Sequence, residues 1–400
     1  FQELFKIKQS SLVLNGIRPQ YTGQPAVIPL GLTWEKSTTL NLGLDFAFLS
    51  NRLQFSGDIY QRKTTDMFTV GMSLPAVFGT DVPKGNYADL TTKGFELSVS
   101  WRDQFQLASK PFNYEVRFTL ADYQSTIDKY NNPEKKLGDD YYYEGMKVGE
   151  IWGYETEGFF TSQADIDSHA KQPYFYAGAT AGQWLPGDIK FKDLNGDGVI
   201  DYGNNTVDNP GDQKIIGNSE PRFIYGINLS GDWNNFFVSA FFQGVGKQDW
   251  WPGSEASYFW GMYNRPYNDM PKSHLGNIWT EENPNTYFPR LRGYSSEEPY
   301  AELNLKQTRY LQNIAYIRMK NIQLGYTLPK SFISKLRMQN AKVYVSGENL
   351  WSWSPFYKYS KDLDVEAVRG SDRDLTEGTS GNGYSYPILK SVSFGLSVTF

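Results

Sequence analysis

The chain has 400 residues, of which 16% are aromatic and 21% are charged, and 39 basic against 44 acidic residues give a net charge of −5. This balance argues against a nucleic-acid partner, because such partners require a basic surface. No uninterrupted apolar run approaches the roughly 18 residues that a membrane-spanning helix needs. Cysteine is absent, which excludes a disulfide framework, thiolate catalysis and cysteine-ligated zinc.

Apolar and polar residues alternate with a period of two along most of the chain. This alternation puts one apolar and one polar face on each β-strand. It is clearest at the end, where Val392, Phe394 and Leu396 alternate with serine and glycine. We expect about ten strands in an all-β fold. The predicted segments lie at 40–48, 53–63, 95–101, 114–120, 222–232, 236–246, 310–328, 341–350 and 392–400.

A soluble sandwich would show the same alternation. The lengths of the strands and of their connections favour a transmembrane antiparallel β-barrel instead. Strands of about ten residues are longer than most strands in soluble sheets, and they can cross a bilayer at a tilt. Their connections also alternate in length, and this is typical of barrels with short periplasmic turns and long extracellular loops. The predicted long loops are about 64–89, 126–221, 247–308 and 351–387.

Seven sequence segments with recognisable motifs are spread along nearly the whole chain. They are Leu32–Phe46, Asn51–Leu53, Tyr60–Asp66, Gly187–Gly198, Ile215–Pro221, Tyr316–Pro329 and Val343–Leu350. Together they resemble the SusC/RagA type of TonB-dependent outer-membrane transporters. That family has a barrel of 22 strands with a plugged lumen. The resemblance implies that residues 1–400 are the C-terminal part of such a barrel, in the bacterial cell outer membrane, and that the plug domain is absent from this chain.

The same resemblance implies a function and a set of partners. The expected function is TonB-dependent active import of oligosaccharides, with a SusD-like surface lipoprotein as a lid over the barrel. Further partners would be outer-membrane lipid, the TonB complex through the plug portion, the oligosaccharide or peptide ligand, and surface glycan-binding proteins and glycosidases. Two alternatives stay open: an oligopeptide importer of the same architecture, and a calcium-stabilised glycan-binding surface β-protein.

Residues 193–201 match the first nine positions of a calcium loop. Ligand positions 1, 3, 5, 7 and 9 are held by Asp193, Asn195, Asp197, Val199 and Asp201, and calcium takes several oxygen ligands. The twelfth position is Asn204 instead of Glu, so the loop is not a complete EF-hand, although Asp208 or Asp212 could supply the missing carboxylate. We expect no required cofactor, and structural calcium competes with a turn that satisfies its own backbone.

The stretch 247–308 is dense in aromatic rings with charged and amide residues between them. Aromatic faces stack on the C–H surfaces of sugars, and carboxylates and amides bind hydroxyl groups. Three uses stay open: ligand capture, a protein interface, since interfaces favour Trp, Tyr and Arg, and packing of the loop's own core. The candidate substrate-binding residues are Trp250, Trp251, Tyr258, Trp260, Tyr263, Arg265 and Asp269.

The remaining polar residues do not suggest catalysis. The chain has two histidines, His169 and His274, and neither falls in a triad, a metal motif or a nucleophile elbow. We therefore predict that the protein is not an enzyme. The charged residues on the polar faces of the predicted strands, Glu96, Arg102, Glu115 and Arg117, are expected to form cross-strand pairs.

Overall fold

The computed structural model describes most of the chain. Described residues are 5, 7–23, 28–29, 31–71, 77, 82–138, 141–173, 184–254, 256–265, 267–292, 296–297, 301–368 and 386–400. Parts of the four predicted long loops, among them 174–183 and 369–385, lie outside these residues. None of the helices in the described part has the length and apolar content needed to cross a membrane.

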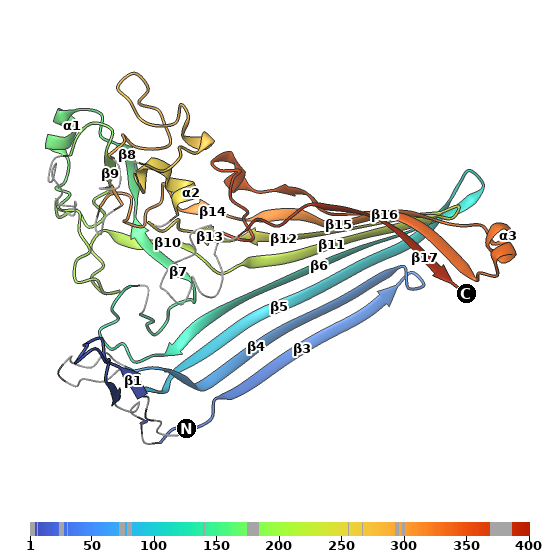
Figure 1. The fold of residues 1–400 in the computed structure, drawn as a ribbon, viewed down its shortest axis with the longest axis horizontal. Coiled ribbons are helices and arrows are strands. Elements are labelled where there is room, and N and C mark those ends of the chain that lie inside the picture. Colours follow the sequence, from blue (N-terminus) through green and yellow to red (C-terminus); the bar gives the residue numbers. More distant parts are fainter. Residues whose placement is uncertain are drawn as a thin grey trace. The chain divides into compact units, whose positions relative to one another are not determined.

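The elements are mainly strands (Figure 1). The strands are β1 (Ile7–Gln9), β2 (Gln20–Thr22), β3 (Lys36–Phe48), β4 (Leu53–Val70), β5 (Lys84–Leu107), β6 (Lys110–Lys129), β7 (Glu150–Tyr154), β8 (Thr156–Phe159), β9 (Ile189–Phe191), β10 (Gln213–Asn218), β11 (Arg222–Trp233), β12 (Phe236–Lys247), β13 (Asp249–Trp250), β14 (Gln312–Asn313), β15 (Tyr316–Thr327), β16 (Asn340–Trp353) and β17 (Ser391–Thr399). Short helices are α1 (Gln163–Ser168), α2 (Ser257–Trp260) and α3 (Lys330–Ile333), with 3₁₀ turns η2 (Gly261–Tyr263), η3 (Lys272–His274), η5 (Ser334–Leu336) and η6 (Pro355–Lys358).

Nine long strands form one sheet in the order β17-β16-β15-β12-β11-β6-β5-β4-β3. Long strands that follow one another in the sequence are neighbours in the sheet, and β6, β11, β12, β15, β16 and β17 pair in antiparallel fashion. Two-residue turns join β5 to β6 and β11 to β12. Both central residues have positive φ, at Ala108 and Ser109 and at Asn234 and Asn235, which matches the right-handed twist of the flanking strands.

The predicted all-β fold with antiparallel strands of barrel type is confirmed, and the predicted strand positions are close to the observed ones. Three strands extend well beyond their predicted segments: β4 continues to Val70, β5 begins at Lys84 and β6 continues to Lys129. In β4 the alternation is weaker because Thr64, Thr65 and Asp66 interrupt the apolar positions.

The chain divides into two compact units. The first consists of Phe1–Asn41, Tyr60–Lys93 and Gln124–Val148, and the second of Leu42–Ile59, Gly94–Tyr123 and Gly149–Phe400. Within the first unit, the Asn86 amide accepts from Thr33 N at 2.9 Å and donates to Thr33 O at 3.0 Å. The second unit contains the main hydrophobic core, which is built from loop segments between Tyr154 and Val368.

Candidate functional site

The strands of the second unit form a wall with two different faces. One row of directly opposed residues crosses six strands and is entirely polar, whereas the row next to it holds apolar residues and one glycine. The polar row is Glu115, Ser230, Ser239, Gln323, Ser346 and Ser393. The other row is Val116, Leu229, Ala240, Ile322, Gly347 and Val392. Since successive residues of a strand point to opposite faces, the wall is polar on one side and apolar on the other.

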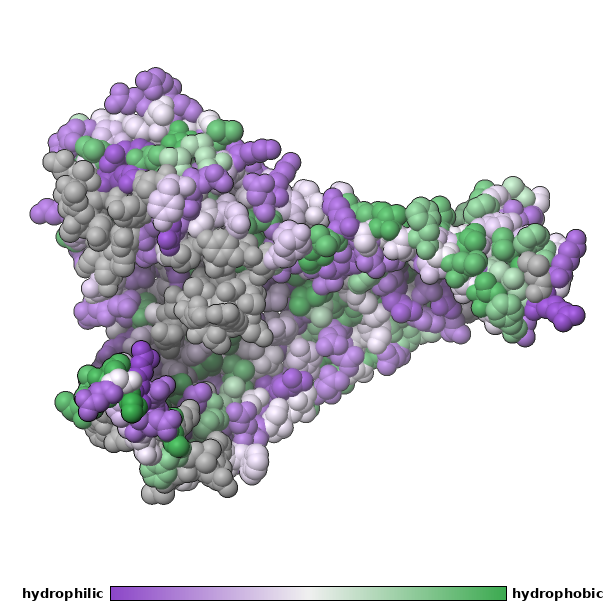
Figure 2. Space-filling view, in the orientation of Figure 1, coloured by the Kyte–Doolittle hydropathy of each residue, from purple (hydrophilic) through white to green (hydrophobic). Residues whose placement is uncertain are grey.

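The apolar side of the wall is exposed. Phe394 is 87% exposed, Leu396 66% and Leu324 52%, and Figure 2 shows apolar residues gathered where β16 and β17 lie. A continuous exposed apolar surface of this kind is rare on a protein surrounded by water, and it marks a contact with lipid or another apolar partner. The faces of the sheet therefore fit a wall that separates a bilayer from an aqueous space.

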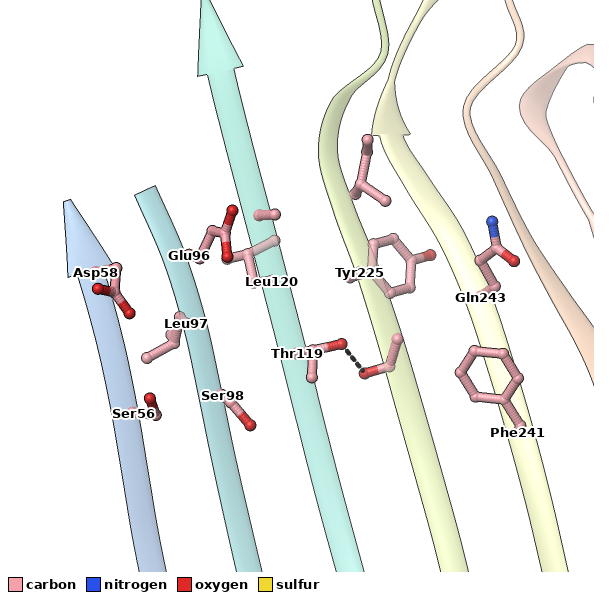
Figure 3. Close-up of a pocket in the computed structure, with 13 residues that line it drawn as sticks. Ser56, Asp58, Glu96, Leu97, Ser98, Thr119, Leu120, Tyr225, Phe241 and Gln243 are labelled. Atoms are coloured by element: carbon pink, nitrogen blue, oxygen red, sulfur yellow. Dashed lines mark hydrogen bonds between the residues drawn. The ribbon is translucent and has the colours of Figure 1, made fainter. Parts of the chain in front are cut away.

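The polar side carries a shallow hollow of about 370 Å³ that crosses β4, β5, β6, β11 and β12 (Figure 3). Asp58 and Glu96 lie at one end of it, and Phe241 and Gln243 at the other. The hollow exists because small residues line its middle. A Cβ at Gly226 would lie only 2.8 Å from the hydroxyl oxygen of Thr119, and that hydroxyl donates to Gly226 O at 3.5 Å. Hydroxyl, carboxylate and amide groups here can bind water or a polar solute.

Three of the four charged side chains that the sequence placed on the polar side form ion pairs. Arg102 Nη2 lies 2.8 Å from Glu115 Oε2, across neighbouring strands, as the sequence predicted. Arg117 lies 3.1 Å from the other oxygen of the same carboxylate, within one strand. Glu96 lines the hollow instead. The guanidinium groups are half exposed, so these pairs orient the side chains more than they stabilise the fold.

Four of the predicted substrate-binding rings lie in the core. Trp250, Trp251, Trp260 and Tyr263 are each at most 4% exposed. Trp260 donates to Pro252 O at 3.0 Å and meets Tyr310 edge to face at 5.2 Å, and the Tyr263 hydroxyl donates to Pro289 O at 2.5 Å. Buried rings whose polar atoms are satisfied are typical of internal packing. Of the three uses left open by the sequence, this geometry favours packing for these four residues.

The other three predicted residues lie at the surface of the same loop region. Tyr258 is 57% exposed, and Arg265 and Asp269 are exposed as well. Arg265 donates to the hydroxyl of Tyr267 at 3.3 Å, and Tyr267 is 77% exposed. These residues present two rings, a guanidinium group and a carboxylate to solvent, while the buried rings beneath them hold the loop in place.

His274 also belongs to this core. It is 1% exposed, its Nε2 pairs with Phe259 O at 2.9 Å, and its ring lies 4.1 Å from the ring of Phe288. Burial lowers the pKa of His274 below its usual value, so the imidazole is neutral near pH 7 and packs as a ring.

In the predicted calcium loop, the side chains bind the backbone of the loop itself. Asp193 accepts from Gly196 N at 2.6 Å and Gly198 N at 2.9 Å, and Asp197 accepts from Val199 N at 2.8 Å. The N–H of Gly198 lowers the pKa of Asp193. Asn195 accepts from Asp197 N, and Asp201 accepts from Gly203 N. Across the described part of the chain, no three Asp, Glu, His or Cys side chains are grouped to hold a metal ion.

The buried carboxylate of Asp212 joins the two ends of this loop. It is 0% exposed and accepts from Leu194 N at 2.6 Å and from Asp201 N at 2.9 Å. Burial raises the pKa of Asp212. The sequence suggested Asp212 as an extra calcium ligand, and here its two oxygens are engaged by backbone N–H groups.

Sequence reasoning missed the buried charges that join distant loop segments. Asp188, which is 0% exposed, binds both Arg290, at 2.6 Å, and Arg292. Glu302, also 0% exposed, accepts from Ile189 N at 2.9 Å. Asp188 and Arg290 are separated by 102 positions, and no local pattern signals such a pair. Removing one partner would leave a buried charge uncompensated.

Comparison with known proteins shows which receptors the chain is similar to. Residues 9–187 match the model of the "TonB dependent receptor-like, beta-barrel" family. The chain is 28% identical to TonB-dependent receptor P3 of Formosa agariphila, over 92% of this chain and 34% of the relative. It is 23% identical to TonB-dependent receptor SusC of Bacteroides thetaiotaomicron, over 95% and 33%. The chain thus spans about a third of the length of these relatives.

The fold matches solved structures over the whole chain. The RagAB peptide importer in its closed-closed state superposes with a TM-score of 0.69 at 18% identity, covering 100% of this chain and 38% of that one. The open-open state gives 0.67 at 20% identity with the same coverage. The exposed apolar face, the polar face opposite and the order of the strands are those of an outer-membrane barrel wall. The chain is thus similar to TonB-dependent receptors of the SusC/RagA type, and its described strands have the fold of part of their outer-membrane β-barrel.

Proposed function

We propose that this chain forms part of the barrel of a TonB-dependent importer that takes up oligosaccharides together with a SusD-like lipoprotein lid. The observation that carries the proposal is the pair of adjacent rows across six strands, one polar and one apolar. An apolar face toward lipid and a polar face toward an aqueous lumen are what a transport wall requires. The same exposed apolar face argues against a soluble glycan-binding β-protein, which would have to bury it.

In this proposal the polar face lines the path of the solute. Its hydroxyl, amide and carboxylate groups exchange hydrogen bonds with water and with the hydroxyl groups of a sugar. No covalent chemistry is needed, because the upstream plug and the TonB complex supply the opening force. The lid and the loops hold the ligand before release into the lumen.

The exposed residues Tyr258, Arg265 and Asp269 are the proposed ligand contacts. A tyrosine ring offers a flat apolar surface to the C–H face of a sugar, and its edge stays in water. Asp269 and Arg265 bind the hydroxyl groups around the ring. Trp250, Trp251, Trp260 and Tyr263, each at most 4% exposed, contribute by fixing the loop that presents these groups.

Oligopeptide import is the second candidate. It is favoured by the similarity to the RagAB peptide importer, and the exposed ring and charge pattern would suit peptide side chains too. The two candidates differ in cargo and share the wall, the lid and the energy source.

Purification of the native receptor in detergent tests the proposal, with mass spectrometry of every co-purifying chain and of every bound small solute. We expect a lipoprotein and a bound oligosaccharide. A bound peptide would establish the alternative, and a receptor that is soluble without detergent would contradict both. The double variant Tyr258→Ala with Arg265→Ala should lower affinity for the recovered solute about tenfold or more. Leu275→Ala, at a 66% exposed apolar site in the same loop region, is the matched control and should leave affinity unchanged.

We also propose that residues 193–201 bind calcium as a structural ion. Support comes from the spacing of Asp193, Asn195 and Asp197 and from the lowered pKa of Asp193, which keeps that carboxylate charged. Calcium would exchange backbone N–H partners for the ion and stiffen a long loop.

A further inference from the structure

The segment 354–368, which follows β16, folds back over the polar side of the wall. Its contacts identify that side. Arg318 lies directly opposite Gln243, and Gln243 is four positions from Ser239 of the polar row on the regular strand β12. Arg318 therefore points to the polar side, and it is there that it binds two carboxylates of the segment. We call residues 354–368 the strap.

Two cations of β15 hold the strap against the wall. Arg318 Nη2 donates to Asp364 Oδ1 at 2.5 Å, and Arg318 Nε lies 2.8 Å from Glu366 Oε1. Lys320 Nζ lies 2.6 Å from the other oxygen of Glu366. The side chains of Arg318, Asp364 and Glu366 are only 4%, 8% and 13% exposed. Asp364 also accepts from Ile388 N at 3.1 Å, which joins the strap to the chain before β17.

Apolar groups of the strap pack into the loop core at the same time. Phe356, Leu363, Val365 and Val368 are each at most 3% exposed and belong to that core. Such packing alone could hold the segment in place, without the burial of the three charged groups of Arg318, Asp364 and Glu366. Buried ion pairs contribute little net stability compared with apolar groups, and their best-attested use is to select one arrangement over others. The charges thus determine where the strap lies more than how strongly it is held.

We propose that the strap is a charge-latched constriction of the passage along the polar side of the wall. In the latched state, Asp364 and Glu366 neutralise Arg318 and Lys320, and the strap occupies space on the lumenal face. In the released state, the carboxylates of the strap return to water, and the two cations of β15 face the passage. The term passage rests on the proposed import function, whereas the latch itself rests on the contacts alone.

Thiol labelling of the full-length receptor tests the latch without any cargo. This chain contains no cysteine, so, with any upstream cysteine replaced by serine, Val365→Cys reports access to the underside of the strap. Lys361→Cys, at an exposed site, reports the intrinsic labelling rate. Asp364→Asn with Glu366→Gln should raise the maleimide labelling rate of the Val365→Cys receptor about tenfold or more, because local opening controls access to a buried thiol. The Lys361→Cys rate should stay the same.

Asp103→Asn with Glu115→Gln is the matched control. It removes the same charge and breaks ion pairs with Arg52, Arg102 and Arg117 away from the strap, and should leave both rates unchanged. A Val365→Cys rate that the latch variant does not change would overturn the proposal, because apolar packing would then suffice. A folded barrel shifts on a gel when it is boiled. If the latch variant does not show this shift, Lys320→Gln is used in its place, and we expect a smaller rise in the labelling rate of the Val365→Cys receptor. If the unmodified receptor imports neither oligosaccharide nor peptide while the labelling response is intact, the proposed function is contradicted and the latch still stands.

Discussion

The barrel wall and the loop core of this chain differ in whether their large apolar side chains are exposed or buried. The wall leaves large apolar side chains exposed, such as Phe394 at 87%, whereas the core encloses Trp260 and Tyr263 completely. The wall is held by strand pairing and by the bilayer around it. The core lies among long loops that face water, so it must stabilise itself by packed rings and satisfied charges. Substitutions should therefore affect the two regions by different mechanisms and to different extents.

The largest effect should come from truncating a core ring. Trp260→Ala removes a fully buried side chain and its bond to Pro252 O, and should cost about 3–5 kcal/mol of loop-core stability. Limited proteolysis of loop 247–308 in the folded receptor measures this loss. Tyr258→Ala, at a 57% exposed neighbour, should change cleavage little. Equal cleavage of the two variants would show that the core does not hold the loop.

The free-energy cost of introducing one charged side chain should differ between the two sides of the wall. Phe394→Arg places a guanidinium group on the apolar side and should cost about 2–4 kcal/mol where the strand crosses the middle of the bilayer. Ser393→Arg, one residue earlier on the polar side, should cost little, because that side faces water. Equilibrium unfolding of the receptor in lipid vesicles measures both. Similar costs for the two variants would contradict the assignment of the faces.

Much of the wall and little of the core could be predicted from the sequence. Alternation is a local signal, and it placed β11, β12 and β17 within one or two residues. The rings of 247–308 were visible as composition, but burial depends on distant partners, such as Phe356 beside Trp250 at 5.9 Å. The pair of Asp188 and Arg290 had no local signal at all. Exposed Tyr258 and buried Trp260 are two residues apart on one helix and could not be told apart by spacing.

Acidification should weaken the core before it affects the wall. The pKa of His274 is lowered by burial from the ordinary value of 6.5, so the unfolded loop binds a proton that the folded loop does not. Stability is therefore complete above about pH 6.5 and falls as pH decreases, by at most about 1.4 kcal/mol per pH unit. Proteolysis of loop 247–308 between pH 7 and pH 5 measures this slope. His274→Gln should flatten it, and an unchanged slope in that variant would assign the effect to other groups.

The smallest expected effect concerns the predicted calcium loop, residues 193–201. If Asp193 and Asp197 bind calcium, adding the ion should slow proteolytic cleavage at 193–204, since the ion replaces flexible backbone contacts with several oxygen ligands. Asp193→Asn with Asp197→Asn should abolish this protection. Asp167→Asn, at an exposed acid on α1, is the matched control and should retain it. Cleavage that calcium does not slow would contradict calcium binding. The hydrogen bonds from the N–H groups of Gly196 and Gly198 to the Asp193 carboxylate would then be what stabilises the turn.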